Sequence, residues 1–240
     1  MSNEYIRSAL APTAKLRATI NVGNPILAGL DETTGEPCGV SVDIARELAT
    51  RLNTELELIV VDAAAKAVQT VMGGGADVGF FAVDPARGAG IAFTAPYVLI
   101  EGCYLVRDDS PIRDNSQVDV PGVRVAAGDG SAYDLFLTRE LKRATIVRVP
   151  TSPAVVGAFI EQGLEVAAGV KQQLQAGAAR HDGLRLIDQP FMVIRQAMGI
   201  AKERGDPAAL YLRAFVDELR ASGFVREALI RHRIAGATPG

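Results

Sequence analysis

Arg87 is the residue of this sequence best suited to bind a small anion. It follows an apolar stretch, residues 78–81, that predicts a short strand, and it lies in a loop with Asp84 and Pro85. Ligands of open α/β sheets bind outside the carboxyl ends of the strands, where a guanidinium can hold a carboxylate through two parallel hydrogen bonds. We therefore predict that Arg87 binds the anionic group of a ligand. The alternative is a solvated loop arginine, because arginine is mostly exposed in proteins.

A second candidate for anion binding is the turn Gly128-Asp129-Gly130-Ser131, which precedes a predicted helix at 132–142. A glycine-rich turn that opens a helix presents backbone N–H groups to an anion, while Ser131 can also simply cap the helix. The turn lacks the last glycine of a dinucleotide-binding fingerprint. The sequence contains no phosphate-binding loop, nucleophile elbow, zinc-protease motif or calcium loop. No catalytic residue is predicted.

The elements that would position Arg87 alternate between strand and helix. Strands are predicted at 16–22, 54–61 and 78–81, and helices at 41–52, capped by Ser41, and at 64–72. The strand at 54–61 is recognised by its period of two, with one face formed by Leu56, Leu58 and Val60 and the other by Glu55 and Glu57. A β-α-β-α-β order indicates a parallel sheet with helices on its faces.

A polar segment at 108–119 leads into a second part with the same layout. Strands are predicted at 121–127, 145–149, 166–170 and 184–187, and helices at 132–142, from Ser152-Pro153 to Gly163, and at 171–180. After an extended return at 191–201, a helix that begins at Asp206-Pro207 carries an apolar stripe formed by Leu210, Ala214, Phe215 and Leu219. A last helix is predicted at 224–232, and residues 235–240 are expected to be frayed.

The composition indicates an ordinary soluble globular chain. Its 240 residues are 48% hydrophobic and 22% charged, and the net charge of −3 gives no electrostatic case for nucleic acid or an anionic membrane. Cys38, Cys103, His181 and His232 lack the spacing of a metal site, and no cofactor is predicted. No apolar run reaches the length of a membrane span. Residues 1–15 show no signal-peptide pattern, so we expect a cytoplasmic chain or a mature form with a new start methionine.

Several short strings, in order and spacing, are similar to those of the family 3 extracellular solute-binding proteins, the amino-acid-binding components of ABC importers. The resemblance covers residues 16 to about 230. The strings are LR at 16–17, GVSVDIA at 39–45, GGADV at 74–78, DPAR at 84–87, IAFTAPY at 91–97, GSA at 130–132, GIAK at 199–202 and DP at 206–207.

The resemblance implies an α/β chain with the two-lobed type II periplasmic-binding-protein fold, in which a ligand is closed between the lobes. Each lobe would be a mostly parallel sheet flanked by helices, and two extended strands would form the hinge. Lobe one would comprise residues 1–106 plus 199–240, and lobe two residues 107–198. The implied function is capture of a small carboxylate or amino-acid-like ligand in the interlobe cleft, by a periplasmic protein with an ABC permease as partner.

Carried over by position, Arg87 matches the arginine that holds the ligand α-carboxylate, and the backbone at Gly130, Ser131 and Ala132 would supply N–H groups. Some positions depart from the family pattern. An aromatic pair is replaced by Asn24 and Leu27, a threonine by Ala82, and the acidic residue that receives the α-ammonium falls at Val170 or Lys171. Because a lysine would repel an ammonium, we expect a carboxylate or dicarboxylate held by Arg87 and Lys171. Two aromatic residues would line the pocket or belong to the core: Phe81 and Tyr133.

Two other functions stay open on the same fold. One is an enzyme of the dehydratase type that acts on cyclic carboxylic acids, for which Glu101 and Asp43 are the candidate pocket-adjacent acids. Release of water or a pyruvate-type product from chorismate, prephenate or arogenate would support it. The other is a cytoplasmic sensor whose ligand-bound form is recognised by a partner protein. Fold alone does not decide between these functions.

Overall fold

The computed structural model describes residues 3–240 and divides the chain into two compact units. The first unit holds the described residues of Met1–Leu99 together with Arg195–Gly240, and the second holds Ile100–Ile194. Strands β6 (Ile91–Arg107) and β11 (Met192–Ala201) run through the two boundaries. The chain thus leaves the first unit once and returns to it once. The assignment of residues 1–106 plus 199–240 and of 107–198 to ligand-binding lobes stays a prediction.

In the first unit, three parallel strands end at one edge. Strand β1 (Lys15–Asn21) pairs in parallel with β4 (Glu55–Val61) along its whole length, and Val78, just before β5 (Gly79–Ala82), bridges Ala18 in parallel. Strand β5 also pairs antiparallel with β11, which carries the returning chain. We call the edge where β1, β4 and β5 end, after Asn21, Val61 and Ala82, the first-unit edge.

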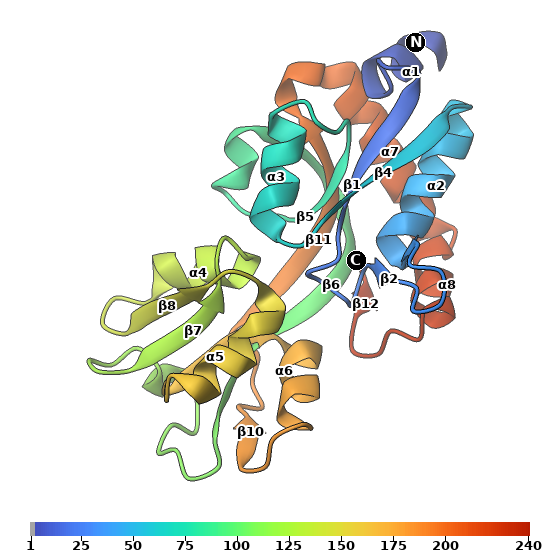
Figure 1. Cartoon of the computed structure of the whole chain (residues 1–240). Coiled ribbons are helices and arrows are strands. Elements are labelled where there is room, and N and C mark those ends of the chain that lie inside the picture. Colours follow the sequence, from blue (N-terminus) through green and yellow to red (C-terminus); the bar gives the residue numbers. More distant parts are fainter. Residues whose placement is uncertain (1–2) are drawn as a thin grey trace. The chain divides into compact units, whose positions relative to one another are not determined.

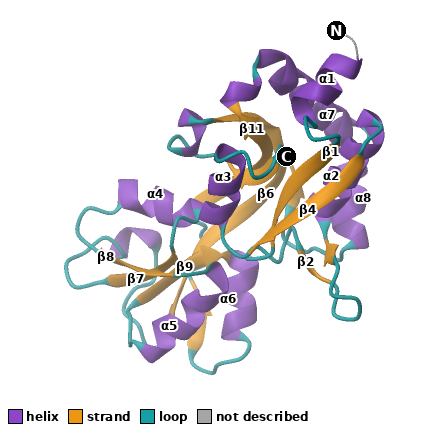
Figure 2. Cartoon of the chain, turned by 45° about the horizontal axis from the view of Figure 1, so that its top comes forward, coloured by secondary structure: helices purple, strands orange, loops and turns teal. Residues whose placement is uncertain are grey.

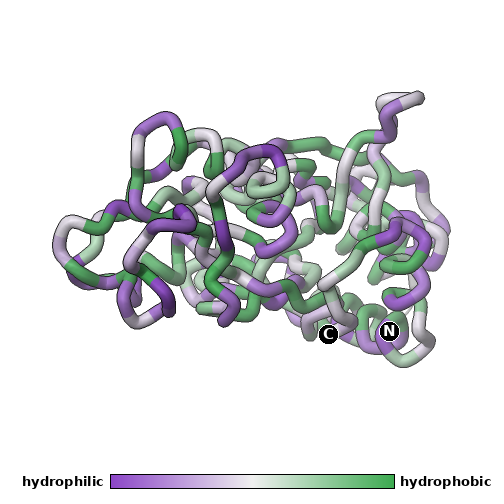
Figure 3. Tube along the Cα trace, turned by 90° about the horizontal axis from the view of Figure 1, so that it is seen from below, coloured by the Kyte–Doolittle hydropathy of each residue, from purple (hydrophilic) through white to green (hydrophobic). Residues whose placement is uncertain are grey.

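Helices cover this sheet. They are α1 (Asn3–Leu10), α2 (Val40–Leu52), α3 (Ala64–Met72), α7 (Asp206–Ala221) and α8 (Phe224–Arg231), and α2 lies beside α8 although they are far apart in sequence (Figure 1). A short hairpin, β2 (Gly29–Leu30) with β3 (Pro37–Cys38), precedes α2. Short 3-10 turns lie at Arg87–Ala89 and Lys202–Arg204. Hydrophilic residues occupy many of the outer turns of the chain trace (Figure 3).

Two details of the predicted helices in this unit are wrong. Helix α2 starts at Val40 and is capped by Gly39 rather than Ser41; Gly39 has φ 117°, and a Cβ there would lie 2.5 Å from the Leu27 carbonyl oxygen. Along α7, Leu210 and Ala214 are exposed. The buried stripe is instead Ala208, Ala209, Leu212, Phe215, Val216 and Leu219. The helical spacing of apolar residues was predicted correctly for α7. The buried face of the helix is rotated about the helix axis from the predicted face.

Two strand details also differ from the prediction. Val60 is 42% exposed, whereas Ile59 and Val61, on the other face of β4, pack against the hydrophobic cluster that includes residues of α3. The C-terminal residues are ordered rather than frayed: β12 (Thr238–Pro239) pairs antiparallel with Val98 and Leu99 of β6. Backbone hydrogen bonding to β6 therefore fixes a tail that has little apolar sequence of its own.

The second unit has its own hydrophobic core, and its strands belong to the same sheet as β6 and β11, which run through the unit boundaries. Strand β7 (Arg124–Gly128) lies between β8 (Thr145–Val149) and β9 (Val166–Val170), parallel to both, while β6 and then β10 (Leu184–Leu186) add antiparallel strands. Its helices are α4 (Ala132–Glu140), α5 (Val155–Glu161) and α6 (Lys171–Ala178), of which α5 and α6 lie together (Figure 2). Further 3-10 turns are Asn115–Gln117 and Ser152–Ala154, the latter in place of the predicted start of α5. The ends of β7, β8 and β9, after Gly128, Val149 and Val170, form what we call the second-unit edge.

Candidate functional site

The first-unit edge brings two predicted site residues to the same end of one sheet. Asn24 follows β1 by three residues, and Arg87 follows β5 by five. Because β1 and β5 run in parallel, both segments leave the sheet at its carboxyl end, which is where open α/β sheets bind ligands. The sequence prediction that placed Arg87 past the end of a strand is confirmed, and the strand itself is β5, residues Gly79–Ala82.

The Arg87 guanidinium is buried rather than solvated. The residue is 7% exposed, and Nη1 donates a hydrogen bond of 3.0 Å to the carbonyl oxygen of Ala82. Burial lowers the pKa of Arg87 to about 10, an effect that the charge of Asp84 partly opposes. The solvated-loop alternative is therefore wrong. At neutral pH the chain keeps this cation in a poorly hydrated place, where the nearby charge of Asp84 favours the charged form.

The loop that carries Arg87 is held in place by Asp84. Its Oδ1 accepts a hydrogen bond of 2.8 Å from the backbone N–H of Ala86, and its carbonyl oxygen accepts one of 2.9 Å from Gly88. Asp84 is itself 4% exposed. An aspartate that bonds to the backbone two residues on favours a tight turn, so the Asp84-Pro85 pair directs the chain into the 3-10 turn at Arg87–Ala89.

Phe81 and Ala82 lie beneath this loop. Phe81 is 3% exposed and packs in a hydrophobic cluster with Ile91 and residues of α3, with its ring edge-to-face against Phe93 at a centroid distance of 6.3 Å. This packing favours the core role for Phe81 over the pocket wall. Ala82 is 5% exposed, and its structural contribution is the carbonyl oxygen that receives the Arg87 hydrogen bond.

Asn24 and Leu27 occupy the turn after β1. The Asn24 carbonyl oxygen accepts hydrogen bonds from the N–H groups of Leu27 and Ala28 at 3.0 and 3.1 Å. Within the described residues, the Asn24 side-chain oxygen Oδ1 is buried and has no hydrogen-bond partner, whereas Leu27 is 3% exposed and packs inward. A buried amide oxygen without a partner is costly. The Asn24 side chain therefore offers an acceptor that a donor group of a ligand would satisfy. Leu27 packs into the interior and does not replace the aromatic side chain that the family has near the ligand.

At the second-unit edge, the glycine-rich turn already holds an internal carboxylate. Asp134, which is 2% exposed, accepts hydrogen bonds from the Gly130 N–H at 2.9 Å and from Arg148 Nε at 3.1 Å. Ser131 caps α4 by accepting a bond of 3.1 Å from the Asp134 N–H, while its own N–H donates to the Gly128 carbonyl at 3.1 Å. Asp134 thus takes one of the places that a ligand anion would occupy. Of the two predicted roles, the capping of α4 by Ser131 is confirmed. Anion binding by the turn stays a prediction.

The sequence prediction missed Asp134, although a signal was present. Ser131 and Asp134 have the S-x-x-D spacing that marks a helix start whose third residue reaches back to the capping turn. Here the carboxylate reaches one residue further, to Gly130, because Arg148 of β8 holds it from the other side. The contact with Arg148 joins two elements and could not be obtained from the local spacing.

Tyr133 and Ala132 open α4 behind the same turn. Tyr133 is 2% exposed, its hydroxyl donates to Ser152 Oγ at 2.8 Å, and burial raises its pKa. A Cβ at position 128 would lie 2.8 Å from this hydroxyl, so a residue larger than glycine would clash with Tyr133 there. This packing favours the core role for Tyr133. Ala132, only partly buried, is the residue whose backbone begins the helix.

Lys171 does not present an isolated positive charge. Its Nζ lies 2.6 Å from Oε2 of Glu101, with about a third of each side chain exposed, and the pairing raises the pKa of Lys171. The two come together because Gly102 of β6 pairs with Val170, the last residue of β9. Beside them Cys103 is buried, and burial raises its pKa to about 11. The expectation that Lys171 acts as a second free cation is corrected by this ion pair.

Asp43, the other acid considered for an enzyme, is tied to helix α8. Its Oδ2 lies 2.6 Å from Arg231 Nη1 and 2.8 Å from His232 Nε2. These contacts join α2 to the end of α8 and give Asp43 a role in packing. Glu101, paired with Lys171, is likewise engaged. No three His, Cys, Asp or Glu side chains within residues 3–240 are grouped so that they could share a metal ion.

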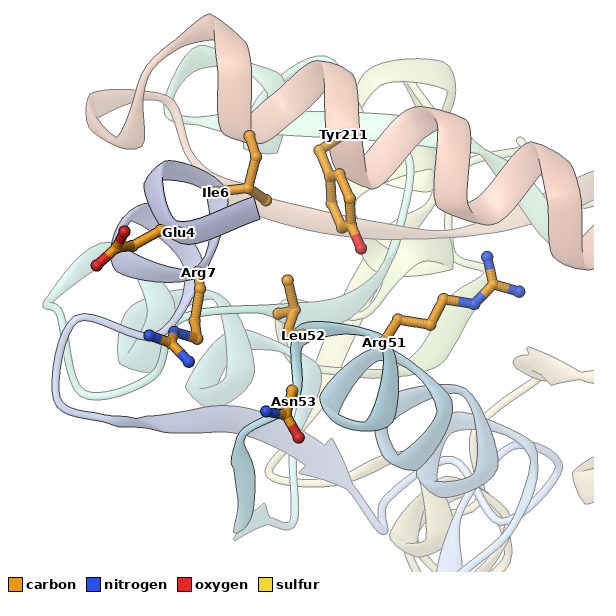
Figure 4. Close-up of a pocket in the computed structure, with 7 residues that line it drawn as sticks. All are labelled: Glu4, Ile6, Arg7, Arg51, Leu52, Asn53 and Tyr211. Atoms are coloured by element: carbon orange, nitrogen blue, oxygen red, sulfur yellow. The ribbon is translucent and has the colours of Figure 1, made fainter. Parts of the chain in front are cut away.

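A further pocket of the first unit lies at the opposite end of its sheet. It has a volume of about 450 Å³ and is lined by α1, the end of α2 and α7, with Ile6 and Leu52 as its apolar side chains and the Tyr211 hydroxyl facing the space between Leu52 and Arg51 (Figure 4). Leu52 and Asn53 lie within three residues of the start of β4, so this pocket adjoins the amino ends of the strands. It is therefore separate from the first-unit edge that carries Arg87.

Comparison with solved structures supports the fold. The solute receptor for L-cysteine of Neisseria gonorrhoeae aligns with a TM-score of 0.81 and 18% identity, covering 96% of this chain and 94% of that one. An amino-acid ABC transporter substrate-binding protein from Streptococcus pneumoniae bound to L-arginine gives 0.79 and 17%, with 98% and 99% covered. A histidine kinase sensor domain similar to periplasmic binding proteins gives 0.78 and 18%, with 94% and 98% covered. At such identities the likeness shows the fold alone, and the predicted type II periplasmic-binding-protein fold is confirmed.

None of the helices in the described part of the chain is long and apolar enough to cross a membrane. No curated protein matches the sequence. The model of the bacterial extracellular solute-binding proteins, family 3, matches residues 20–231, which is most of the chain and the range in which the sequence strings were found. The family describes binding proteins rather than enzymes, in agreement with the prediction that favoured solute binding over a dehydratase. The chain belongs to the family 3 bacterial extracellular solute-binding proteins.

Proposed function

We propose that this protein binds a small carboxylate or amino-acid-like compound and that Arg87 receives the carboxylate. One observation carries the proposal: a charged guanidinium is buried at the carboxyl end of a parallel sheet. A ligand carboxylate would bind this guanidinium through charge-assisted hydrogen bonds, which are strong in a poorly hydrated place. The buried, unpartnered Oδ1 of Asn24, which follows the neighbouring strand, supplies an acceptor for a donor group of the ligand.

An amino acid is the ligand class best supported. The prediction of a dicarboxylate depended on a free positive charge at Lys171, and this charge is paired with Glu101. A ligand group near this pair is close to the Glu101 carboxylate as well as to the Lys171 ammonium. Repulsion by Lys171 therefore no longer excludes a ligand with an α-ammonium. The solved neighbours described for L-arginine and L-cysteine agree with this class. Ala82, Gly130, Ser131 and Ala132 remain candidate contacts through their backbones.

We further propose that the protein works outside the cytoplasm and delivers its ligand to an ABC permease. The support is the family, whose members are extracellular solute-binding proteins. Fractionation of cells that produce the protein from its own gene would test the location. Recovery from the cytoplasmic fraction alone would contradict delivery to a permease and favour the sensor.

The decisive test is to identify what the protein carries. Native mass spectrometry of the purified protein, followed by denaturation, releases and identifies any bound small molecule. We expect one amino acid or monocarboxylate per chain in the wild type and none in Arg87→Gln. The matched control is Arg195→Gln, since Arg195 is an exposed arginine of the same unit. A ligand that stays bound at wild-type occupancy in Arg87→Gln would contradict the assignment of Arg87.

A further inference from the structure

The second unit contains a pocket at the end of its sheet opposite the second-unit edge. The pocket has a volume of about 610 Å³ and lies between the polar segment 109–123 and the turn at Leu164 and Glu165. Val123 directly precedes β7, and Glu165 directly precedes β9. The pocket therefore adjoins the amino ends of these parallel strands, whereas Ser131 and Lys171 follow their carboxyl ends. It is a separate place from the site of the proposed function.

The interior of this pocket is apolar although the segment that covers it is polar in sequence. Its hydrophobic lining consists of Pro111, Ile112, Val120, Val123 and Leu164. Of these, Ile112 and Val123 are 7% exposed and Leu164 is 2% exposed, so their side chains point away from bulk solvent. Water in such a space finds few polar partners, and removing the apolar surface from water is favourable.

Three charged residues line the pocket: Asp109 is exposed to solvent, whereas Arg107 and Glu165 are engaged within the second unit. Arg107 Nη1 donates to the Leu164 carbonyl at 2.6 Å, and its guanidinium lies 4.6 Å from the centre of the Phe159 ring. Glu165 is held by Arg124, with Oε1 at 2.8 Å from Nη2 and Oε2 at 2.9 Å from Nε. A charged ligand that approached Arg107 or Glu165 would have to compete with these contacts. The pocket thus favours an uncharged ligand.

The covering segment is fixed from outside the pocket. Arg185 Nη2 donates to the carbonyl oxygens of Ser110 and Ile112 at 3.1 and 2.7 Å. A capping box between Asp114 and Gln117 closes the following 3-10 turn. Because these bonds order the segment, a ligand would not have to pay the entropy of ordering it. The pocket is therefore preformed, like most small-molecule sites.

We infer that this pocket is a second binding site, for an uncharged and largely apolar small molecule with an aromatic or branched aliphatic body. Its volume falls in the range of about 300–1,000 Å³ typical of small-ligand pockets. Its apolar walls supply the binding free energy, and the internal contacts of Arg107 and Glu165 disfavour ions. The inference does not depend on the proposed function, because it uses residues of the second unit only.

The test uses N-phenyl-1-naphthylamine, an uncharged probe that fluoresces in apolar surroundings, titrated into the full chain. We expect saturable binding of one probe per chain. Val120→Trp, which fills the pocket, should weaken binding at least about tenfold. The matched control is Val193→Trp, because Val193 is 50% exposed on β11 of the same unit and does not line the pocket. This control should bind as the wild type does.

Ser116→Trp is a second pocket-filling variant, which should also weaken binding of the probe. Ser116 lines the pocket at an exposed position, so this substitution does not disturb the core. Thermal unfolding of each variant confirms that it folds. The anionic analogue 8-anilinonaphthalene-1-sulfonate should bind more weakly than the neutral probe, and Arg87→Gln should leave the neutral probe unaffected. Binding that is not saturable, or that is equal in the wild type and both tryptophan variants of the pocket, would overturn the inference. Tighter binding of the sulfonate would overturn the claim of selectivity against ions.

Discussion

Lys171 Nζ lies 2.6 Å from Glu101 Oε2, although the two residues are 70 positions apart in the chain. The pair forms because β6 runs antiparallel beside β9, which brings Glu101 to the start of α6. The arrangement changes the expected charge at the second-unit edge from one free cation to a neutral pair.

Glu101→Gln should shift ligand preference towards dicarboxylates. Removing the carboxylate leaves the ammonium of Lys171 without this partner, and the pKa of Lys171, which the pair raises, should fall. In titration calorimetry, succinate should gain affinity relative to a neutral amino acid, whereas Lys171→Gln should disfavour succinate. An unchanged preference in both variants would remove Lys171 from the list of ligand contacts.

Arg87→Met should lose carboxylate binding while the folded state is kept. The side chain that it replaces is charged and buried, so the variant removes a desolvated charge along with one hydrogen bond to Ala82. We expect a melting temperature close to or above that of the ligand-free wild type. Differential scanning calorimetry measures this, and a large fall in melting temperature would instead assign Arg87 a structural role.

The affinity of the wild type for a carboxylate should show the titration of Arg87. Because burial lowers its pKa to about 10, the guanidinium is fully charged near neutral pH, and affinity should fall as the pH rises through about 10. The unfolded state holds this proton more tightly, so as the pH rises above about 10 this group's contribution to stability rises with pH. Calorimetric titrations from about pH 7 to pH 10.5 would measure the fall in affinity. Constant affinity across that range would contradict the role of Arg87.

Asp134→Ala should destabilise the second unit by about 2 kcal/mol, because it leaves the Gly130 N–H and Arg148 without their buried acceptor. Arg148→Met should cost less, since 43% of the Arg148 side chain is exposed. Urea unfolding of both variants gives the comparison. If Arg148→Met were the more costly, Asp134 would not be the residue that fixes the turn.

Thr19→Val should be neutral or stabilising by up to about 1 kcal/mol. Thr19 is 1% exposed, and its hydroxyl has no hydrogen-bond partner among the described residues, so valine removes a buried polar group without changing the shape. Thr94→Val is the control: the Thr94 hydroxyl donates to the Ala95 carbonyl and accepts from the Met198 N–H. That variant should lose about 1–2 kcal/mol of stability in chemical unfolding. Equal losses at both positions would show that the Thr19 hydroxyl has a partner in solution.

Much of this fold could be predicted from local sequence patterns. The alternation of strands and helices, the strand before Arg87 and the glycine-rich turn before α4 depend on residues within a few positions of each other, and such patterns persist in the folded chain. The exact faces could not be predicted in the same way. Val60 and Leu210 fit the predicted period and are nevertheless exposed, because what covers a strand or helix comes from other parts of the chain.

The family, the order of the elements and the position of Arg87 after the end of a strand could be read from the sequence alone. The state of the candidate side chains depends on tertiary contacts: Arg87 is buried, Phe81 and Tyr133 pack in cores, Lys171 pairs with Glu101, and Asp134 holds the Gly130 turn. Burial and charge pairing depend on what other segments bring within a few ångströms. Those contacts come from strand pairing and helix packing, and no local spacing specifies them.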